Sequence, residues 1–186
     1  MSTITAPVAT STTWSIDTFH SEILFKVKHL VITTVTGKFK NFSGKVETEN
    51  ADFRNAKIEF SADVNSIDTG AEGRDTHLKS DDFFNAEKYP EIKFTGTSLT
   101  HVGDDHWILQ GDITIRDVTK PVSFEVLYMG MIDDPWGNRK VGFEVNGKIK
   151  RKDFGLKWDV VTEAGGVVAG DEVRIHCNAQ FIKQKS

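Results

Sequence analysis

The sequence predicts an all-β protein, an antiparallel barrel of about eight strands with one or two short helices covering part of it. Three observations predict this class. Apolar and polar residues alternate with a period of two through most of the chain. The number of alternating segments is about that at which a closed barrel encloses side chains or one small ligand. A length of 186 residues fits one such domain.

The expected strands share one pattern, in which apolar side chains point to one face and polar side chains to the other. They are residues 14–18, 36–48, 57–66, 91–100, 107–116, 122–128, 141–150 and 173–181. The sequence DVTKP at 117–121 is expected to form the turn between two of them.

Two regions depart from the alternation. Residues 70–90 are expected to form one or two short helices that stop before Pro90 and cover a barrel end, with apolar side chains that dock onto it. The candidate docking residues are Leu78, Phe83 and Phe84. Residues 20–35 carry an apolar excess without sustained alternation, so they are open to interpretation as strand or short helix.

Glycines inside the expected strands favour a barrel. They are Gly37, Gly44, Gly96, Gly111 and Gly147. Glycine weakens a sheet unless a sharp bend or a bulge is required, and barrel corners require such bends. A two-sheet sandwich can use the same glycines, so it stays the alternative fold.

The N-terminal residues lack periodicity. Residues 1–12, rich in Thr, Ser and Ala, are expected to form a flexible tail, and residues 13–184 the barrel domain. No basic residue precedes an apolar core of signal-peptide length, so a cytoplasmic location is expected. No apolar run approaches the ~18 residues of a membrane-spanning helix, so no membrane span is expected.

Charge and cysteine content exclude several functions. The 27 acidic and 23 basic residues are interspersed and give a net charge of −4, so no nucleic-acid partner is expected. The single cysteine, Cys177, excludes an internal disulfide and is expected to be a small buried hydrophobe. His101 and His106 flank VGDD, which is typical of a hairpin loop, and neither a metal nor another cofactor is expected.

Five segments, taken together and in order, resemble the YceI-like family of polyisoprenoid-binding proteins. They are WSIDTFHSEILFKVKHL at 14–30, VTGKFKNFSGKVE at 35–47, GRDTHLKSDDFFNAEKYPEIKF at 73–94, GDITIRDVTKPVSFEV at 111–126 and KRKDFGLKW at 150–158. The resemblance covers nearly all of residues 13–183. It implies a lipocalin-like barrel, a long isoprenoid chain in the apolar lumen, and a possible homodimer. Many relatives resemble exported periplasmic proteins, whereas no signal peptide is expected in this sequence.

Closing the alternating strands would bring their apolar faces together in a lumen that can hold a linear hydrocarbon. Each buried CH₂ contributes ~0.8 kcal/mol, so several isoprene units outweigh an association cost of ~4–15 kcal/mol. The candidate lining residues are Phe25, Val27, Phe39, Phe42, Phe60, Phe94, Ile113, Phe124, Phe143 and Ile175. For each of them, ordinary core packing without ligand contact is the alternative.

A polar headgroup would lie at the mouth of the lumen. The candidate headgroup residues are Asp17, His20, Arg74, Asp75 and His77, with solvated loop charges as the alternative interpretation. The leading hypothesis is non-enzymatic binding, storage or transport of a polyprenyl chain, an isoprenoid quinone or a prenyl phosphate derivative. Two alternatives remain: an enzyme that acts on such a lipid through His20, Asp17 or His77, and a stress-linked interaction protein with a vestigial cavity.

Overall fold

The computed structural model describes residues 10–49, 52–160 and 168–186. In these ranges the chain forms one 11-stranded sheet, an α-helix and two 3-10 helices. The strands are β1 (Ser11–Ile16), β2 (Glu22–His29), β3 (Thr33–Phe39), β4 (Phe42–Glu49), β5 (Asp52–Asp63), β6 (Ile67–Asp68), β7 (Glu91–Gly103), β8 (His106–Ile115), β9 (Val118–Asp133), β10 (Arg139–Lys150) and β11 (Ala169–Lys183). The helices are α1 (Glu72–Lys79), η1 (Val64–Ser66) and η2 (Arg151–Phe154).

Three of the barrel strands are each interrupted once and therefore count as two strands, so the eleven strands form an eight-stranded barrel. β1 and β2 pair with opposite halves of β11 and are separated by residues 17–21. β3 and β4 are separated by Lys40 and Asn41, and β5 and β6 by η1. Since β1 pairs with both β4 and β11, the sheet closes, and all its neighbours are antiparallel. The predicted barrel is confirmed, and the sandwich alternative is wrong.

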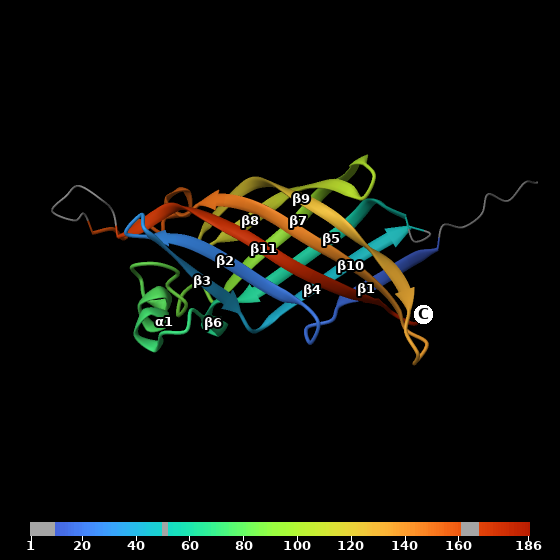
Figure 1. Cartoon of the computed structure of the whole chain (residues 1–186), viewed down its shortest axis with the longest axis horizontal. Coiled ribbons are helices and arrows are strands. Elements are labelled where there is room, and N and C mark those ends of the chain that lie inside the picture. Colours follow the sequence, from blue (N-terminus) through green and yellow to red (C-terminus); the bar gives the residue numbers. More distant parts are fainter. Residues whose placement is uncertain (1–9, 50–51, 161–167) are drawn as a thin grey trace, which may run out of the picture.

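The barrel is elongated and its two ends differ (Figure 1). α1 and the β2–β3 turn lie at one end, which we call the helix end. The hairpin between β9 and β10 lies at the opposite, far end. Trp14 is fully buried, packs on Phe53 and donates its indole N–H to the Thr48 hydroxyl at 3.2 Å. Because β5 begins at the far end, this cluster fills the barrel interior there.

Residues 20–35 resolve as strands. They contain β2, the start of β3 and a tight turn in which the Ile32 N–H donates to the His29 carbonyl at 3.2 Å. The φ angles of Leu30 (50°) and Val31 (66°) are both positive, which defines a type I′ turn. Asn-Gly is the favoured pair at these positions, and left-handed backbone costs an L residue about 1–2 kcal/mol.

The helical region at residues 70–90 contains one α-helix, α1, followed by turns up to Pro90. No residue of α1 is fully buried. Phe83, after the helix, is buried, whereas Leu78 and Phe84 are partly buried against the core. The predicted docking residues therefore do attach this segment to the barrel.

The turn expected at 117–121 is wrong. Arg116 and Asp117 form the turn, and Pro121 lies within β9 opposite Asp112. The pairing of β9 with β10 begins only at Glu125, so the missing N–H of Pro121 leaves no hydrogen bond to β10 unmade. This is why a proline is tolerated inside the strand.

Of the predicted tail, residues 1–12, the first nine residues lie outside the described part of the chain. β1 begins at Ser11. Within the described part of the chain, no helix is both long enough and apolar enough to cross a membrane.

Candidate functional site

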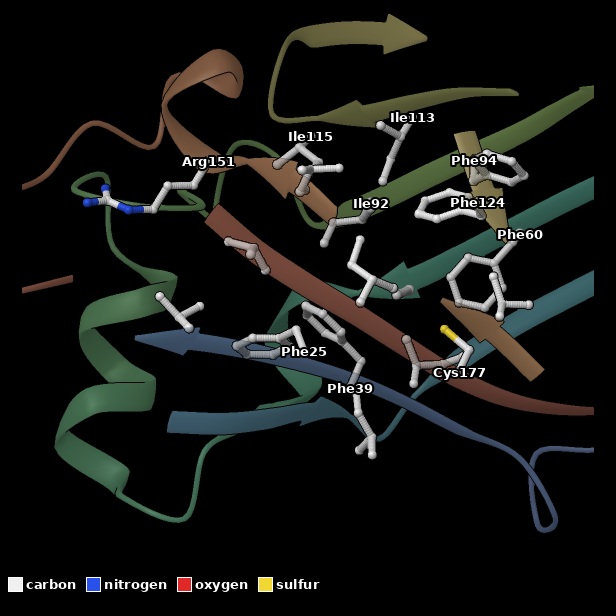
Figure 2. A pocket seen from close by; sticks show the side chains of 18 of the residues that line it. Phe25, Phe39, Phe60, Ile92, Phe94, Ile113, Ile115, Phe124, Arg151 and Cys177 are labelled. Atoms are coloured by element: carbon white, nitrogen blue, oxygen red, sulfur yellow. The ribbon is translucent and has the colours of Figure 1, made fainter. Parts of the chain in front are cut away.

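An apolar cavity of about 460 Å³ lies inside the barrel (Figure 2). Side chains from β1 to β5 and from β7 to β11 line it. Along β11 the alternate residues are Val173, Ile175, Cys177, Ala179 and Phe181, and all of them face the cavity. At about 3.3 Å per residue these positions span roughly 26 Å, so the cavity is elongated along the strand.

Glycines paired with phenylalanines keep the lumen open. In three places a ring lies over a glycine of the adjacent strand, where an added Cβ would overlap the ring. The pairs are Phe25 with Gly37, Phe94 with Gly111, and Phe124 with Gly147. Each ring therefore lies against the barrel wall, in space that a larger side chain would fill, and leaves the centre of the lumen free.

Substitution of Gly147 by Ala tests this packing. The new Cβ forces the Phe124 ring toward the cavity, so we expect a loss of about 1–3 kcal/mol in the free energy of unfolding, measured by urea denaturation. Gly142→Ala on the same strand is the matched control, because its Cβ would meet only the Met129 Cβ at 3.4 Å. Equal stability of the two variants would contradict the proposed role of Gly147.

The cavity opens at the helix end. Four of its lining residues are exposed to solvent, and they are Lys28, His29, Gly73 and Arg74. The first two end β2 and the last two lie in α1, so all four border one mouth. At the other end of the cavity the lining residue Phe53 is buried against Trp14.

The ionisable lining residues, Cys177 aside, are all basic or histidine. They are Lys28, His29, Arg74, His77 and Arg151, and no Asp or Glu joins them among the described residues. His77 donates a 2.8 Å hydrogen bond from Nε2 to the Asp82 carboxylate and packs edge-on against Trp158. The mouth therefore favours an anionic or hydrogen-bonding headgroup over a cationic one.

Comparison with known proteins agrees with this geometry: residues 14–181 match the YceI-like domain family. The chain belongs to this family. Protein YceI from Escherichia coli O17:K52:H18 is 39% identical over 166 residues, which cover 89% of this chain and 83% of that protein.

Solved structures share the fold. The crystal structure of the Campylobacter jejuni YCEI protein has 28% identity and a TM-score of 0.70, and the match covers 86% of this chain and 91% of that one. A Saccharophagus degradans structure, described as a polyisoprenoid binding domain implicated in plant cell wall breakdown, has 17% identity and a TM-score of 0.68. This match covers 92% of the YceI-like chain and 98% of the other, and at its identity it shows a shared fold alone.

Most of the predicted lining residues surround the cavity of this YceI-like barrel. Those that do are Phe25, Val27, Phe39, Phe60, Phe94, Ile113, Phe124, Phe143 and Ile175. Phe42 does not line it, and instead stacks on Phe60 with ring centroids 6.2 Å apart. Its place in the alternation is that of an inward-facing residue, but its ring packs against the core without lining the cavity. Ligand contact by the nine stays a prediction.

The predicted headgroup residues do not form one site. Arg74 and His77 line the cavity at the mouth, whereas Asp75 does not line it and accepts a 2.6 Å hydrogen bond from the Thr69 hydroxyl, to which Arg74 also donates. Asp17 and His20 lie in the loop between β1 and β2, where Asp17 contacts Gln180 on β11. Arg151 at the mouth contacts Gly170, ten residues before Gln180 on the same strand. Because ten residues of strand span about 33 Å, Asp17 lies far from the mouth.

The loop that contains Asp17 and His20 has a structural role in the YceI-like barrel. Burial alone would raise the pKa of Asp17, but hydrogen bonds from His20, the Phe19 N–H and Gln180 outweigh it and lower the pKa. The Asp17 carboxylate therefore holds the loop between β1 and β2 against β11 through its hydrogen bond with Gln180. Neither Asp17 nor His20 lines the cavity, so of the three residues named for the enzyme alternative His77 alone lies at the mouth.

Sequence reasoning missed three residues of the mouth, namely Lys28, His29 and Arg151. The guanidinium of Arg151 is buried and donates to four carbonyls at 2.7–2.9 Å, those of Leu156, Trp158, Ala169 and Gly170. These bonds hold η2 and the residues after it against the start of β11, so Leu156 and Trp158 can form part of the cavity wall. The only signal for Arg151 in the sequence was its place in KRKDFGLKW, a segment typical of the family.

Cys177, predicted to be buried, is partly buried and lies on the cavity wall (Figure 2). Burial raises the pKa of its thiol to about 12. At pH 8 only about one thiol in ten thousand is then ionised, and the thiolate is the reactive form. We expect iodoacetamide to alkylate native protein very slowly and urea-unfolded protein within minutes, as measured by intact mass. Equal rates in the two states would contradict this.

His101, away from the mouth, has a structural role. His101 bonds the Asp104 carbonyl in the β7–β8 hairpin and packs on Trp107. Across the described ranges, no group of three or more His, Cys, Asp and Glu side chains is placed to hold a metal ion.

Proposed function

We propose that this YceI-like barrel binds a long isoprenoid lipid in its cavity, without covalent chemistry, for storage or transport. The observation that carries the proposal is the elongated apolar cavity, open at one basic mouth and packed shut at the far end. The relative from Saccharophagus degradans, described as a polyisoprenoid binding domain, gives independent support.

The cavity suits a chain with repeated methyl branches. Its wall consists almost entirely of aliphatic and aromatic side chains, so affinity would come from burial of CH₂ and CH₃ groups at ~0.8 kcal/mol each. A polyprenyl chain, an isoprenoid quinone and a prenyl phosphate derivative share this tail. Their headgroup would lie at the mouth, within reach of Arg74 and His77.

Native mass spectrometry of the full chain purified from its own cells tests the proposal. We expect a bound species of isoprenoid mass, released intact by solvent extraction. Protein that is empty after gentle purification and takes up no polyprenol would overturn the proposal and favour the vestigial-cavity alternative. A chemically changed lipid after incubation would favour the enzyme. The same spectra test the homodimer, and cell fractionation tests the cytoplasmic location.

A further inference from the structure

A small apolar surface projects from the helix end beside the mouth of the cavity. It consists of Leu30, Val31, Ile32 and Val160, which we call the apolar tip. The exposed fractions are 67% for Val31, 81% for Ile32 and 47% for Val160. Three consecutive exposed apolar residues at a hairpin turn are unusual, because turns normally carry polar residues and glycine.

The apolar tip is continuous with the wall of the cavity. The Leu30 N–H donates to the Val168 carbonyl, and the Val168 N–H donates to the Val160 carbonyl, both at 3.0 Å. Val168 itself lines the cavity, and so do Lys28 and His29, which precede the tip on β2. A lipid that enters or leaves through the mouth therefore passes directly beside the tip.

The left-handed backbone conformation of the turn is unfavourable for the two apolar residues at its centre. Leu30 and Val31 are the apolar members of the six described non-glycine residues with positive φ. Asn-Gly would satisfy the same type I′ turn without strain. Residues that break a local rule in this way are expected mainly at functional positions, where their side chains serve a contact outside the fold.

Charge around the mouth indicates the nature of that contact. Lys28 and Arg74 are exposed at the rim, and the cavity lining contains no acidic residue in the described part of the chain. Apolar side chains flanked by exposed basic residues match the interface of a bilayer with anionic headgroups.

We propose that the apolar tip docks on an anionic lipid bilayer and inserts its side chains there, so that the isoprenoid chain moves directly between the membrane and the cavity. This inference rests on the proposed function, because it identifies the bilayer as the source and the acceptor of the ligand. At the far end, Ile132 and Val102 are also exposed but have no cavity mouth beside them.

The test replaces both central residues of the turn, Leu30→Asn with Val31→Gly, in the full chain. Because this pair fits the turn better, we expect the Tm to rise by roughly 2–6 °C. Association with phosphatidylcholine vesicles that contain phosphatidylglycerol, measured by flotation, is expected to fall about tenfold or more. A folding defect cannot explain weaker association in a more stable variant.

The matched control is Val102→Asn with Ile132→Asn, which removes two exposed apolar side chains from the far end. Wild-type association is expected for this control. Added salt should weaken binding of the unaltered chain to the anionic vesicles. Equal flotation of the turn variant and wild type, or no flotation of wild type, would overturn the proposal.

Uptake of a polyprenol from detergent micelles separates this inference from the proposed function. The turn variant should take up the polyprenol as wild type does, because its cavity is unchanged, but should draw it from vesicles more slowly. Uptake from micelles without vesicle association in wild type would overturn docking and leave the carrier function in place. Failure of uptake from micelles in wild type would overturn the carrier function itself.

Discussion

Substitution of Cys177 by Trp is expected to reduce the affinity of the barrel for a long polyprenol by about 1,000-fold. Cys177 lies on β11 with its sulfur facing the cavity, between the lining residues Ile175 and Ala179. An indole there would occupy the space of about one isoprene unit, whose five carbons contribute about 4 kcal/mol when buried. The measurement is retention of radiolabelled polyprenol by the protein during gel filtration.

Asn178→Trp is the matched control for this substitution. Asn178 is the next residue of β11, is exposed and points to the outer face, so the same side chain is added to the same strand without entering the cavity. We expect wild-type affinity for it. The cooperative thermal unfolding of both variants shows that the barrel is intact. Undiminished binding by a folded Cys177→Trp protein would contradict the site.

Substitution of Arg151 by Met is expected to destabilise the barrel by about 3–5 kcal/mol. The guanidinium is buried and satisfies four backbone carbonyls, which Met would leave without a donor. Asp159 would also lose the buried cation that lies 3.8 Å away. Because these bonds hold the mouth together, we expect hydrogen exchange to increase first in η2 and at the start of β11.

Lys152→Met provides the control for Arg151. Lys152 is the adjacent residue and forms a 2.8 Å ion pair with Asp159, but its side chain is 41% exposed. Loss of such a pair costs about 0–1 kcal/mol, because solvent screens it. Urea denaturation compares the two variants. If both lose the same free energy of unfolding, Arg151 does not organise the mouth.

The fold could be predicted from sequence because alternation is a local property. In β11 the residues from Val173 to Phe181 alternate between the two faces, and this alone determines which side chains point inward. The same reasoning identified nine cavity residues. It failed where a break interrupts a strand, as at Lys40 and Asn41, and where the turn residues are atypical, as at Leu30 and Val31.

The sequence by itself determined that the strands have one apolar face and that enough of them exist to close a barrel. Tertiary structure alone decided that the barrel is hollow. The free volume depends on pairs such as Phe124 and Gly147, which are distant in sequence and meet only through the register of β9 and β10. Tertiary structure also separated Asp17 from Arg74. A period of two fixes the direction of a side chain, whereas the space it leaves depends on its neighbour across the sheet.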